Sequence, residues 1–162
     1  MNRATPGRIL YSALLLPLLL AASAVHSDTP ARVVSVHDGD TLTVLIERRQ
    51  VKVRLADIDA PELGQPFGAN SKRSLSDLCF GKAAMLDVRG KDRYKRTIAQ
   101  VTCAGTDANA EQVRRGLAWT YTRYAKVGSP LHAIQWAARQ DHRGLWADPT
   151  PVPPWDWRRN GH

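Results

Sequence analysis

Three short runs of alternating apolar residues, joined only by tight turns, constrain what this chain can fold into more than any other feature. They cover residues 34–37, 41–46 and 51–55, with Asp38-Gly39 and the charged triplet 47–49 between them. Alternate side chains of a β-strand point to opposite faces, so each run predicts a strand with one apolar face. An Asp-Gly pair is typical of a tight turn between antiparallel strands. The sequence therefore predicts a three-stranded antiparallel meander.

Two further strands and three helices are expected after the meander. The strands are predicted over residues 85–89 and 94–103, where apolar residues recur at strand spacing. The helices are predicted over 66–81, 109–116 and 129–144, each reaching a glycine, a residue that favours the end of a helix. The order of these elements predicts an α+β, mainly β, fold: an OB-fold five-stranded Greek-key barrel with three helices.

Local features refine the helical part of this prediction. Asn109, with Gln112 three residues later, resembles a capping box that starts the second helix. Ser129-Pro130 is a typical start for the third helix, since proline fits the first helical position. The C-terminal tail, residues 149–162, is rich in proline and tryptophan and is expected to be largely irregular.

The N-terminal segment, residues 1–27, is typical of a signal peptide. Two arginines precede an apolar run over residues 9–25, and small residues favour cleavage after Ala24 or Ser27. The alternative is an uncleaved membrane anchor, but a run of 17 residues is short for a span of about 20. We therefore expect a secreted or periplasmic protein that has no stable membrane association once the segment is removed.

Charge and cysteine content narrow the possible partners and compartments. The chain holds 23 Lys and Arg against 15 Asp and Glu, a formal net charge of +8, which favours a polyanionic partner such as nucleic acid or anionic lipid. Cys79 and Cys103 are the only cysteines. An oxidising compartment favours a disulfide between them, and two buried free thiols are the alternative.

Acidic residues at or near predicted strand ends form the most chemically informative pattern. Convergence of Asp40, Asp59 and Glu62 calls for a cation or for protonation, because two carboxylates about 4 Å apart repel by roughly 4 kcal/mol at an effective dielectric near 20. Hard oxygen ligands favour Ca²⁺ or Mg²⁺, and a metal so held can clamp a phosphate and orient water. Glu62 is then the candidate base, and Arg54 and Arg96 are candidates for charge stabilisation. Singly, each feature also fits a hairpin turn, a solvated loop or a surface charge.

The combination of motifs strongly resembles the staphylococcal nuclease family. It consists of Asp38-Gly39-Asp40-Thr41, the stretch 54–62, Asp92-Arg93-Tyr94-Lys95-Arg96, and Asn109 followed by 113–118. We take the domain to span residues 28–148. The resemblance implies an OB-fold barrel and a Ca²⁺-dependent endonuclease acting on DNA and RNA, which cleaves the 5′ P–O bond and leaves 3′-phosphate ends.

The resemblance also implies a role for individual residues. Asp40 and Asp59 correspond to calcium carboxylates, together with the backbone carbonyl of Ala60, where the family often has threonine. Glu62 corresponds to the residue that positions or deprotonates the attacking water and can reach the metal through it. The catalytic residues of the family correspond in this sequence to Arg54, Glu62 and Arg96.

Four further residues are candidate substrate contacts. Tyr94 occupies a position in the family motif, and Lys95 follows it where the family commonly has glycine. Tyr121 and Tyr124 lie in a region that departs from the family pattern. Aromatic side chains can stack on bases at about 1–3 kcal/mol per base without sequence preference, although packing at the edge of the barrel is the alternative for each tyrosine.

Two hypotheses from different classes remain open at the level of the sequence. The first is an active, monomeric, exported nuclease with DNA and RNA as substrates. The second is a catalytically inactive OB-fold module that binds nucleic acid or protein. The presence of Glu62 together with both arginines favours the nuclease, since a binding module has no need of a water-activating carboxylate.

Overall fold

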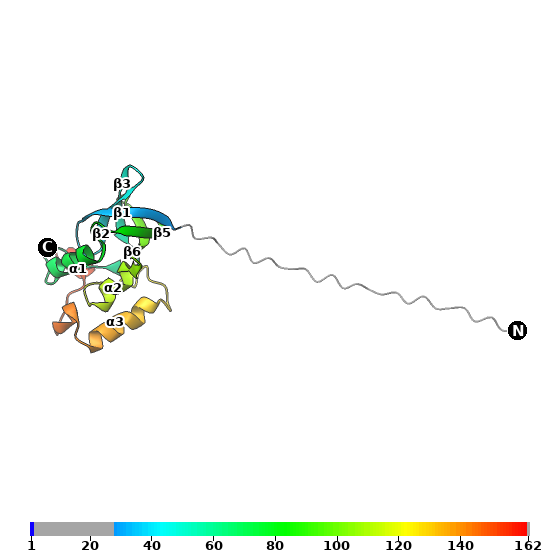
Figure 1. Ribbon diagram of the computed structural model, residues 1–162. Helices are drawn as coiled ribbons and strands as arrows, with labels where there is room; N and C mark the ends of the chain where they lie inside the picture. Colours follow the sequence, from blue (N-terminus) through cyan, green and yellow to red (C-terminus); the bar gives the residue numbers. More distant parts are fainter. Residues whose placement is uncertain (2–27, 162) are drawn as a thin grey trace.

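The computed structural model describes Met1 and residues 28–161. Residues 28–161 form a closed mixed β-barrel with helices packed against it (Figure 1). The sheet order is β3-β2-β1-β5-β6, and a parallel pairing of β3 with β6 closes the barrel. The barrel strands are β1 (Thr29–Val36), β2 (Thr41–Ile46), β3 (Arg49–Leu55), β5 (Ala83–Lys91) and β6 (Thr97–Cys103). The predicted five-stranded OB-fold barrel is confirmed.

Three two-residue strands complete the sheets. β7 (Thr106–Asp107) extends the barrel sheet beside β6. β4 (Ile58–Asp59) and β8 (Trp119–Thr120) pair with each other antiparallel, outside the barrel sheet. This small pairing fixes the backbone on which Asp59 lies.

The alternating pattern of the meander produces the barrel core. Leu42, Val44 and Val53 are fully buried, and they come from the two strands that pair in register over residues 41–46 and 49–54. In β1 the fully buried residue is Val33, not one of the valines of the predicted run 34–37. A register shift between β1 and β2 moves the inward-facing position by one residue.

Three substantial helices are present, as predicted: α1 (Gly68–Cys79), α2 (Ala108–Arg114) and α3 (Pro130–Gln140). The barrel strands contact α1 and α2, and α3 packs against α2 and β8. Ser129 caps α3 by accepting a hydrogen bond from the Leu131 amide. The predicted capping box at Asn109 is wrong, since Asp107 caps α2 through the Ala110 amide. The side chain of Asn109 is instead buried and satisfies backbone groups of the barrel.

A disulfide joins Cys79, the last residue of α1, to Cys103, the last residue of β6, which confirms the predicted pairing. The bridge ties the helix that follows the candidate site to the strand that closes the barrel. Closure of a loop of this length stabilises the fold by about 3 kcal/mol in the chain-entropy model.

The C-terminal tail, predicted to be largely irregular, contains a short helix that the prediction missed. After the 3-10 helix η1 (Gly144–Ala147), residues Pro154–Arg159 form the helix α4. Proline at its first position, Asp156 in its first turn and two arginines in its last turn all suit a helix. Trp155 of α4 packs against a second apolar cluster built on Trp119, Ala138, Leu145 and Trp146.

Two observations concern the ends of the chain and the membrane. No helix in the part of the chain that the structure describes is long and apolar enough to cross a membrane. The predicted signal peptide, residues 1–27, lies outside the described residues apart from Met1, so its identity stays a prediction.

Candidate active site

The turn between β1 and β2 carries Asp40 into the interior of the molecule. Gly39 makes this possible, because a Cβ there would lie 1.8 Å from Ser71 Oγ and 2.7 Å from Ala60 Cβ. The buried Gln112 side chain fixes the turn by donating from Nε2 to the Gly39 carbonyl at 2.7 Å and to the Ser71 carbonyl at 3.0 Å. The Asp40 carboxylate is therefore placed by close packing of the turn against α1.

Three donors converge on the buried Asp40 carboxylate. The Ala60 amide donates at 2.9 Å, Thr41 Oγ1 donates at 2.9 Å, and Arg54 Nη1 lies 2.6 Å from Oδ2. Burial acts to raise the pKa of Asp40, but the charge of Arg54 and these hydrogen bonds hold it below its ordinary value. Asp40 is thus ionised and ready to hold positive charge.

Arg54 bridges two of the predicted metal carboxylates. Strand pairing sets it opposite Thr41, the residue that follows Asp40. Its Nη1 contacts Asp40, and its Nη2 donates to Asp59 Oδ1 at 2.8 Å. The Arg54 side chain is 16% exposed and that of Asp59 is 1% exposed, so this is a largely buried ionic network.

A second guanidinium, from the C-terminal helix, holds the opposite side of Asp59. Arg158 Nη2 lies 2.6 Å from Asp59 Oδ2, and Nη1 lies 2.6 Å from Glu62 Oε1. Sequence reasoning missed Arg158. The only local indication was the density of tryptophan and arginine in the tail, because the partners are 99 and 96 residues apart along the chain.

The pKa of Asp59 moves in the opposite direction to that of Asp40. Burial is the largest influence on this carboxyl, and together with the neighbouring Asp40 charge it raises the pKa. Hydrogen bonds from Arg158 and the charge of Arg54 oppose the rise without cancelling it. Asp59 therefore needs positive partners on both sides in order to stay charged.

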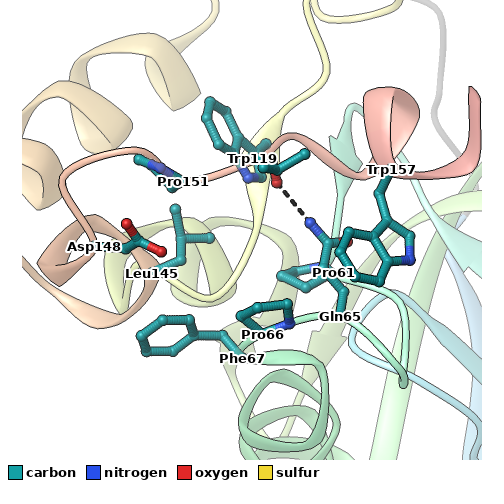
Figure 2. Close-up of a pocket in the computed structure, with 10 residues that line it drawn as sticks. Pro61, Gln65, Pro66, Phe67, Trp119, Leu145, Asp148, Pro151 and Trp157 are labelled. Atoms are coloured by element: carbon teal, nitrogen blue, oxygen red, sulfur yellow. Dashed lines mark hydrogen bonds between the residues drawn. The ribbon is translucent and has the colours of Figure 1, made fainter. Parts of the chain in front are cut away.

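The turn after β4 fixes Glu62 at the surface of this network. Gln65 accepts from the Glu62 amide at 3.2 Å and returns a backbone hydrogen bond to the Glu62 carbonyl at 2.9 Å. The Gln65 side chain also donates to the Val152 carbonyl of the tail at 2.6 Å, which is the dashed bond in Figure 2. The Glu62 side chain is 40% exposed, so solvent reaches its carboxylate.

Arg96 reaches the rim of the network from the hairpin between β5 and β6. Asp92 orders this hairpin by accepting from the amides of Tyr94 and Arg96, each at 2.9 Å, and from Arg96 Nε at 2.7 Å. Arg96 Nη1 lies 3.5 Å from Thr41 Oγ1, which itself donates to Asp40. Arg54 and Arg96 thus approach Asp40 from different strands.

Comparison of the sequence with known proteins finds a matching family. Residues 52–148 match the model described as Staphylococcal nuclease homologue. The chain belongs to this family. It is 44% identical over 153 residues to an uncharacterized endonuclease of Haemophilus influenzae, a match that covers 94% of this chain and 85% of the relative.

Two further relatives are similar over most of their lengths. The chain is 38% identical over 152 residues to micrococcal nuclease of Shigella flexneri, covering 88% of this chain and 87% of the relative. It is 35% identical over 164 residues to Protein ParB of Escherichia coli, covering 95% and 93%. As a staphylococcal nuclease homologue, the chain is therefore similar to each of these relatives over most of its length.

Tyr94 and Lys95 of this homologue lie at the tip of the Arg96 hairpin. Lys95 has φ of 64°, in the left-handed region where glycine is favoured, so the backbone at this position suits glycine better than lysine. The exposed Tyr94 ring lies 4.7 Å from the Arg93 guanidinium carbon and 5.5 Å from that of Arg96. These side chains form a basic, aromatic rim beside the carboxylates.

Tyr121 and Tyr124 pack against α4 and each other, not with Tyr94 and Lys95 on the Arg96 hairpin. The Tyr121 ring stacks on Trp155 of α4, with centroids 5.2 Å apart and planes 11° apart. Tyr124 packs edge-on against Tyr121 and is itself exposed. One face of Tyr121 is therefore covered by the tail, whereas Tyr124 stays open to a ligand.

The donor chemistry of the site suits a hard divalent cation, provided that Arg158 moves away from Asp59 and Glu62. Asp40 and Asp59 supply buried carboxylate oxygens, and Glu62 supplies an exposed one. Among the described residues, no group of three or more His, Cys, Asp or Glu side chains is arranged so that it could hold a metal ion. Arg158 lies between Asp59 and Glu62, so a metal that uses both residues requires this guanidinium to move.

Asp38 is a further carboxyl that sequence reasoning treated only as a turn residue. Its Oδ1 accepts a hydrogen bond from the Asp40 amide at 3.0 Å. Burial, followed by the Asp40 charge, raises the pKa of Asp38 to about 6. The structure thus adds a weakly acidic group beside the predicted metal ligand.

Proposed function

We propose that this protein is a calcium-dependent endonuclease that hydrolyses phosphodiester bonds of DNA and RNA and leaves 3′-phosphate ends. The observation that carries the proposal is the Arg54 guanidinium shared by Asp40 and Asp59, within a chain of the staphylococcal nuclease homologue family. Relatives named as endonuclease and micrococcal nuclease support phosphodiesterase chemistry.

The two buried aspartates, with the backbone carbonyl of Ala60, are the proposed calcium ligands. Asp40 is preorganised for this role by the Ala60 amide and Thr41, which fix its carboxylate before any metal arrives. When bound, calcium would supply positive charge next to a phosphate oxygen and help orient the attacking water. Asp59 also gains from a cation, because burial disfavours its charged form.

Glu62 is proposed as the residue that positions or deprotonates the attacking water. Its carboxylate stands at the exposed side of the network, and its backbone is held on both sides by Gln65. A base must be within reach of water and fixed in orientation, and this arrangement meets both needs.

The arginines are proposed to stabilise negative charge that develops on the phosphate. Arg54 is rigid, since it is mostly buried and paired to two carboxylates, and Arg96 is held by Asp92. Donors that are fixed before reaction avoid reorganisation in the transition state, which is the main source of electrostatic catalysis. Tyr94, Lys95, Tyr121 and Tyr124 are the proposed substrate contacts.

We also propose that residues 1–27 direct export and are removed, and that the exported domain acts as a monomer. The Cys79–Cys103 disulfide supports an oxidising compartment outside the cytoplasm. N-terminal sequencing of the protein recovered from the periplasm or medium tests the cleavage site, which is expected after Ala24 or Ser27.

Plasmid nicking tests the activity directly. We expect cleavage with calcium and none with excess chelator, and a loss of about 100-fold or more in Glu62→Gln, the order of a lost general base. Glu47→Gln is the matched control, because Glu47 is exposed at the β2–β3 turn, at the other end of β2 from Asp40. Products should accept a kinase label at their 5′ ends without phosphatase treatment, as 5′-hydroxyl ends do. A folded protein that shows no calcium-dependent cleavage would instead support the binding-module hypothesis.

A further inference from the structure

The helix α4 lies against the candidate active site and contributes a charge to it. Trp157 lines a pocket with Pro61 and Gln65, next to the turn that carries Glu62 (Figure 2). Arg158 follows directly and contacts both Asp59 and Glu62. The C-terminal helix therefore ends on two residues of the site.

Arg158 uses oxygens that the proposed function requires for other purposes. It takes Asp59 Oδ2 and Glu62 Oε1, each at 2.6 Å, and Asp59 Oδ1 at 3.4 Å. Arg54 already holds Asp59 Oδ1 at 2.8 Å. Both Asp59 oxygens therefore accept from guanidinium groups, and Arg158 takes Oδ2, the oxygen that Arg54 does not contact.

A guanidinium and a divalent cation compete for these oxygens. They carry like charge and need the same acceptors, so each weakens the binding of the other. Arg54 is 16% exposed and held by the barrel, whereas the Arg158 side chain is 42% exposed. Arg158 is therefore the group that can leave into solvent.

The rest of α4 does not depend on this ionic contact. Trp155 packs edge-on against Trp119, with ring centroids 5.7 Å apart, and stacks on Tyr121. Pro154 is buried, and Gln65 holds the Val152 carbonyl just before the helix. The helix can keep its place while the Arg158 side chain swings away.

We propose that Arg158 is an internal counter-ion that competes with calcium for Asp59 and Glu62, so that the C-terminal helix sets the calcium concentration at which the enzyme works. The inference rests on the proposed calcium site. In the metal-free protein Arg158 neutralises the carboxylates, and calcium must displace it in order to bind. Its removal should raise calcium affinity by the coupling between the two cations, typically 5- to 150-fold.

The test is a calorimetric calcium titration of three forms of the purified protein: wild type, Arg158→Gln and Arg159→Gln. Arg159 is the matched control, since it lies in the same helical turn, pairs with Asp156 and has a 76% exposed side chain. We expect Arg158→Gln to bind calcium about fivefold or more tightly than wild type, and Arg159→Gln to stay within about twofold. Thermal unfolding in chelator checks that all three are folded.

A second measurement uses the wild type alone and so does not depend on a variant folding. Arginine side-chain NMR signals report whether a guanidinium is protected from exchange with water. Calcium should remove the protection of the Arg158 signals over the same concentration range that saturates the site, while Arg54 stays protected. Protection of Arg158 that persists in the calcium-saturated protein would overturn the inference.

The remaining outcomes separate this inference from the proposed function. If wild type binds calcium and cleaves DNA but Arg158→Gln binds calcium equally or more weakly, the competition is refuted and the nuclease assignment stands. Weaker binding would mean that Arg158 aligns the carboxylates for the metal. If wild type neither binds calcium nor cleaves, the proposed function fails and the inference fails with it.

Discussion

Asp59 is held by two arginines that come from different regions of the molecule, and the contrast between them is instructive. Arg54 extends from strand β3, is mostly buried, and also holds Asp40. Arg158 extends from the last helix, is 42% exposed, and also holds Glu62. Removing a partner from a buried ion pair is costly, whereas an exposed pair contributes little. The barrel therefore supplies the fixed charge of the site, and the tail supplies an exchangeable one.

The largest effect is expected for Arg54→Gln, which sharpens this contrast. It leaves Asp40 and Asp59 without their shared counter-ion, so the free energy of unfolding should fall by about 3–5 kcal/mol. Cleavage rate should fall by about 100- to 1,000-fold, the loss typical of a fixed charge-stabilising donor. Arg158→Gln should lower the free energy of unfolding less, by about 1–2 kcal/mol, because Arg54 still pairs with the buried Asp59. Urea unfolding and initial rates measure both, and equal stability losses would erase the distinction between barrel and tail.

Removal of the disulfide tests how much the link between α1 and β6 contributes to the stability of the barrel. Replacement of both Cys79 and Cys103 by serine should lower the free energy of unfolding by about 3 kcal/mol. Calcium affinity should change little while the protein stays folded, since the bridge lies at the far ends of α1 and β6 from the carboxylates. Denaturant unfolding and calcium titration of the double variant provide the measurements. A large loss of calcium affinity in a folded variant would show that the site depends on the bridge directly.

Trp155→Ala should weaken the packing of α4 against the rest of the domain. Trp155 is half-buried between Trp119 and Tyr121, so its loss should cost about 2 kcal/mol, less than the 3–5 typical of a fully buried tryptophan. The variant should also bind calcium more tightly, because Arg158 would no longer be delivered to Asp59. Trp136→Ala on α3 is the control, since Trp136 is 65% exposed. A destabilised variant with unchanged calcium affinity would count against delivery of Arg158 by the helix.

The smallest effect is expected for a change at Asp92, the partner of Arg96. Burial acts to raise the pKa of Asp92, but hydrogen bonds from Arg96 lower it below its ordinary value. A depressed pKa in the folded state means that the carboxylate stabilises the fold above its unfolded pKa of about 3.9, and that this stability is lost as pH falls through the folded value. Asp92→Asn should lower the free energy of unfolding by about 1 kcal/mol at pH 7. This difference from the wild type should disappear at pH values below about 4. A difference that stays constant down to pH 2 would contradict this account.

Much of the barrel was determined by the sequence itself. The period-two pattern over 41–46 and 51–55 specifies which side chains enter the apolar core, among them Leu42, Val44 and Val53, because a strand alternates its faces whatever its partner. Two cysteines leave a single possible pairing within the chain, and Cys79–Cys103 is that pairing. The motif residues around Asp40, Arg54 and Asp59 could be found for a similar reason, since strand ends and turns place them locally.

Only the tertiary structure decided which segments far apart in the sequence contact one another. Asn109 resembled a helix cap by its spacing, but its buried amide donates to the Ala56 carbonyl and accepts from the Val101 amide, across the fold. Sequence reasoning assigned no role to Arg158, yet it pairs with Asp59 from 99 residues away. Contacts between distant segments leave no periodicity in the local sequence, because the free energy that selects them comes from burial and charge in the folded state. The control of calcium binding that we infer for Arg158 depends on such a contact, so only the folded structure indicated it.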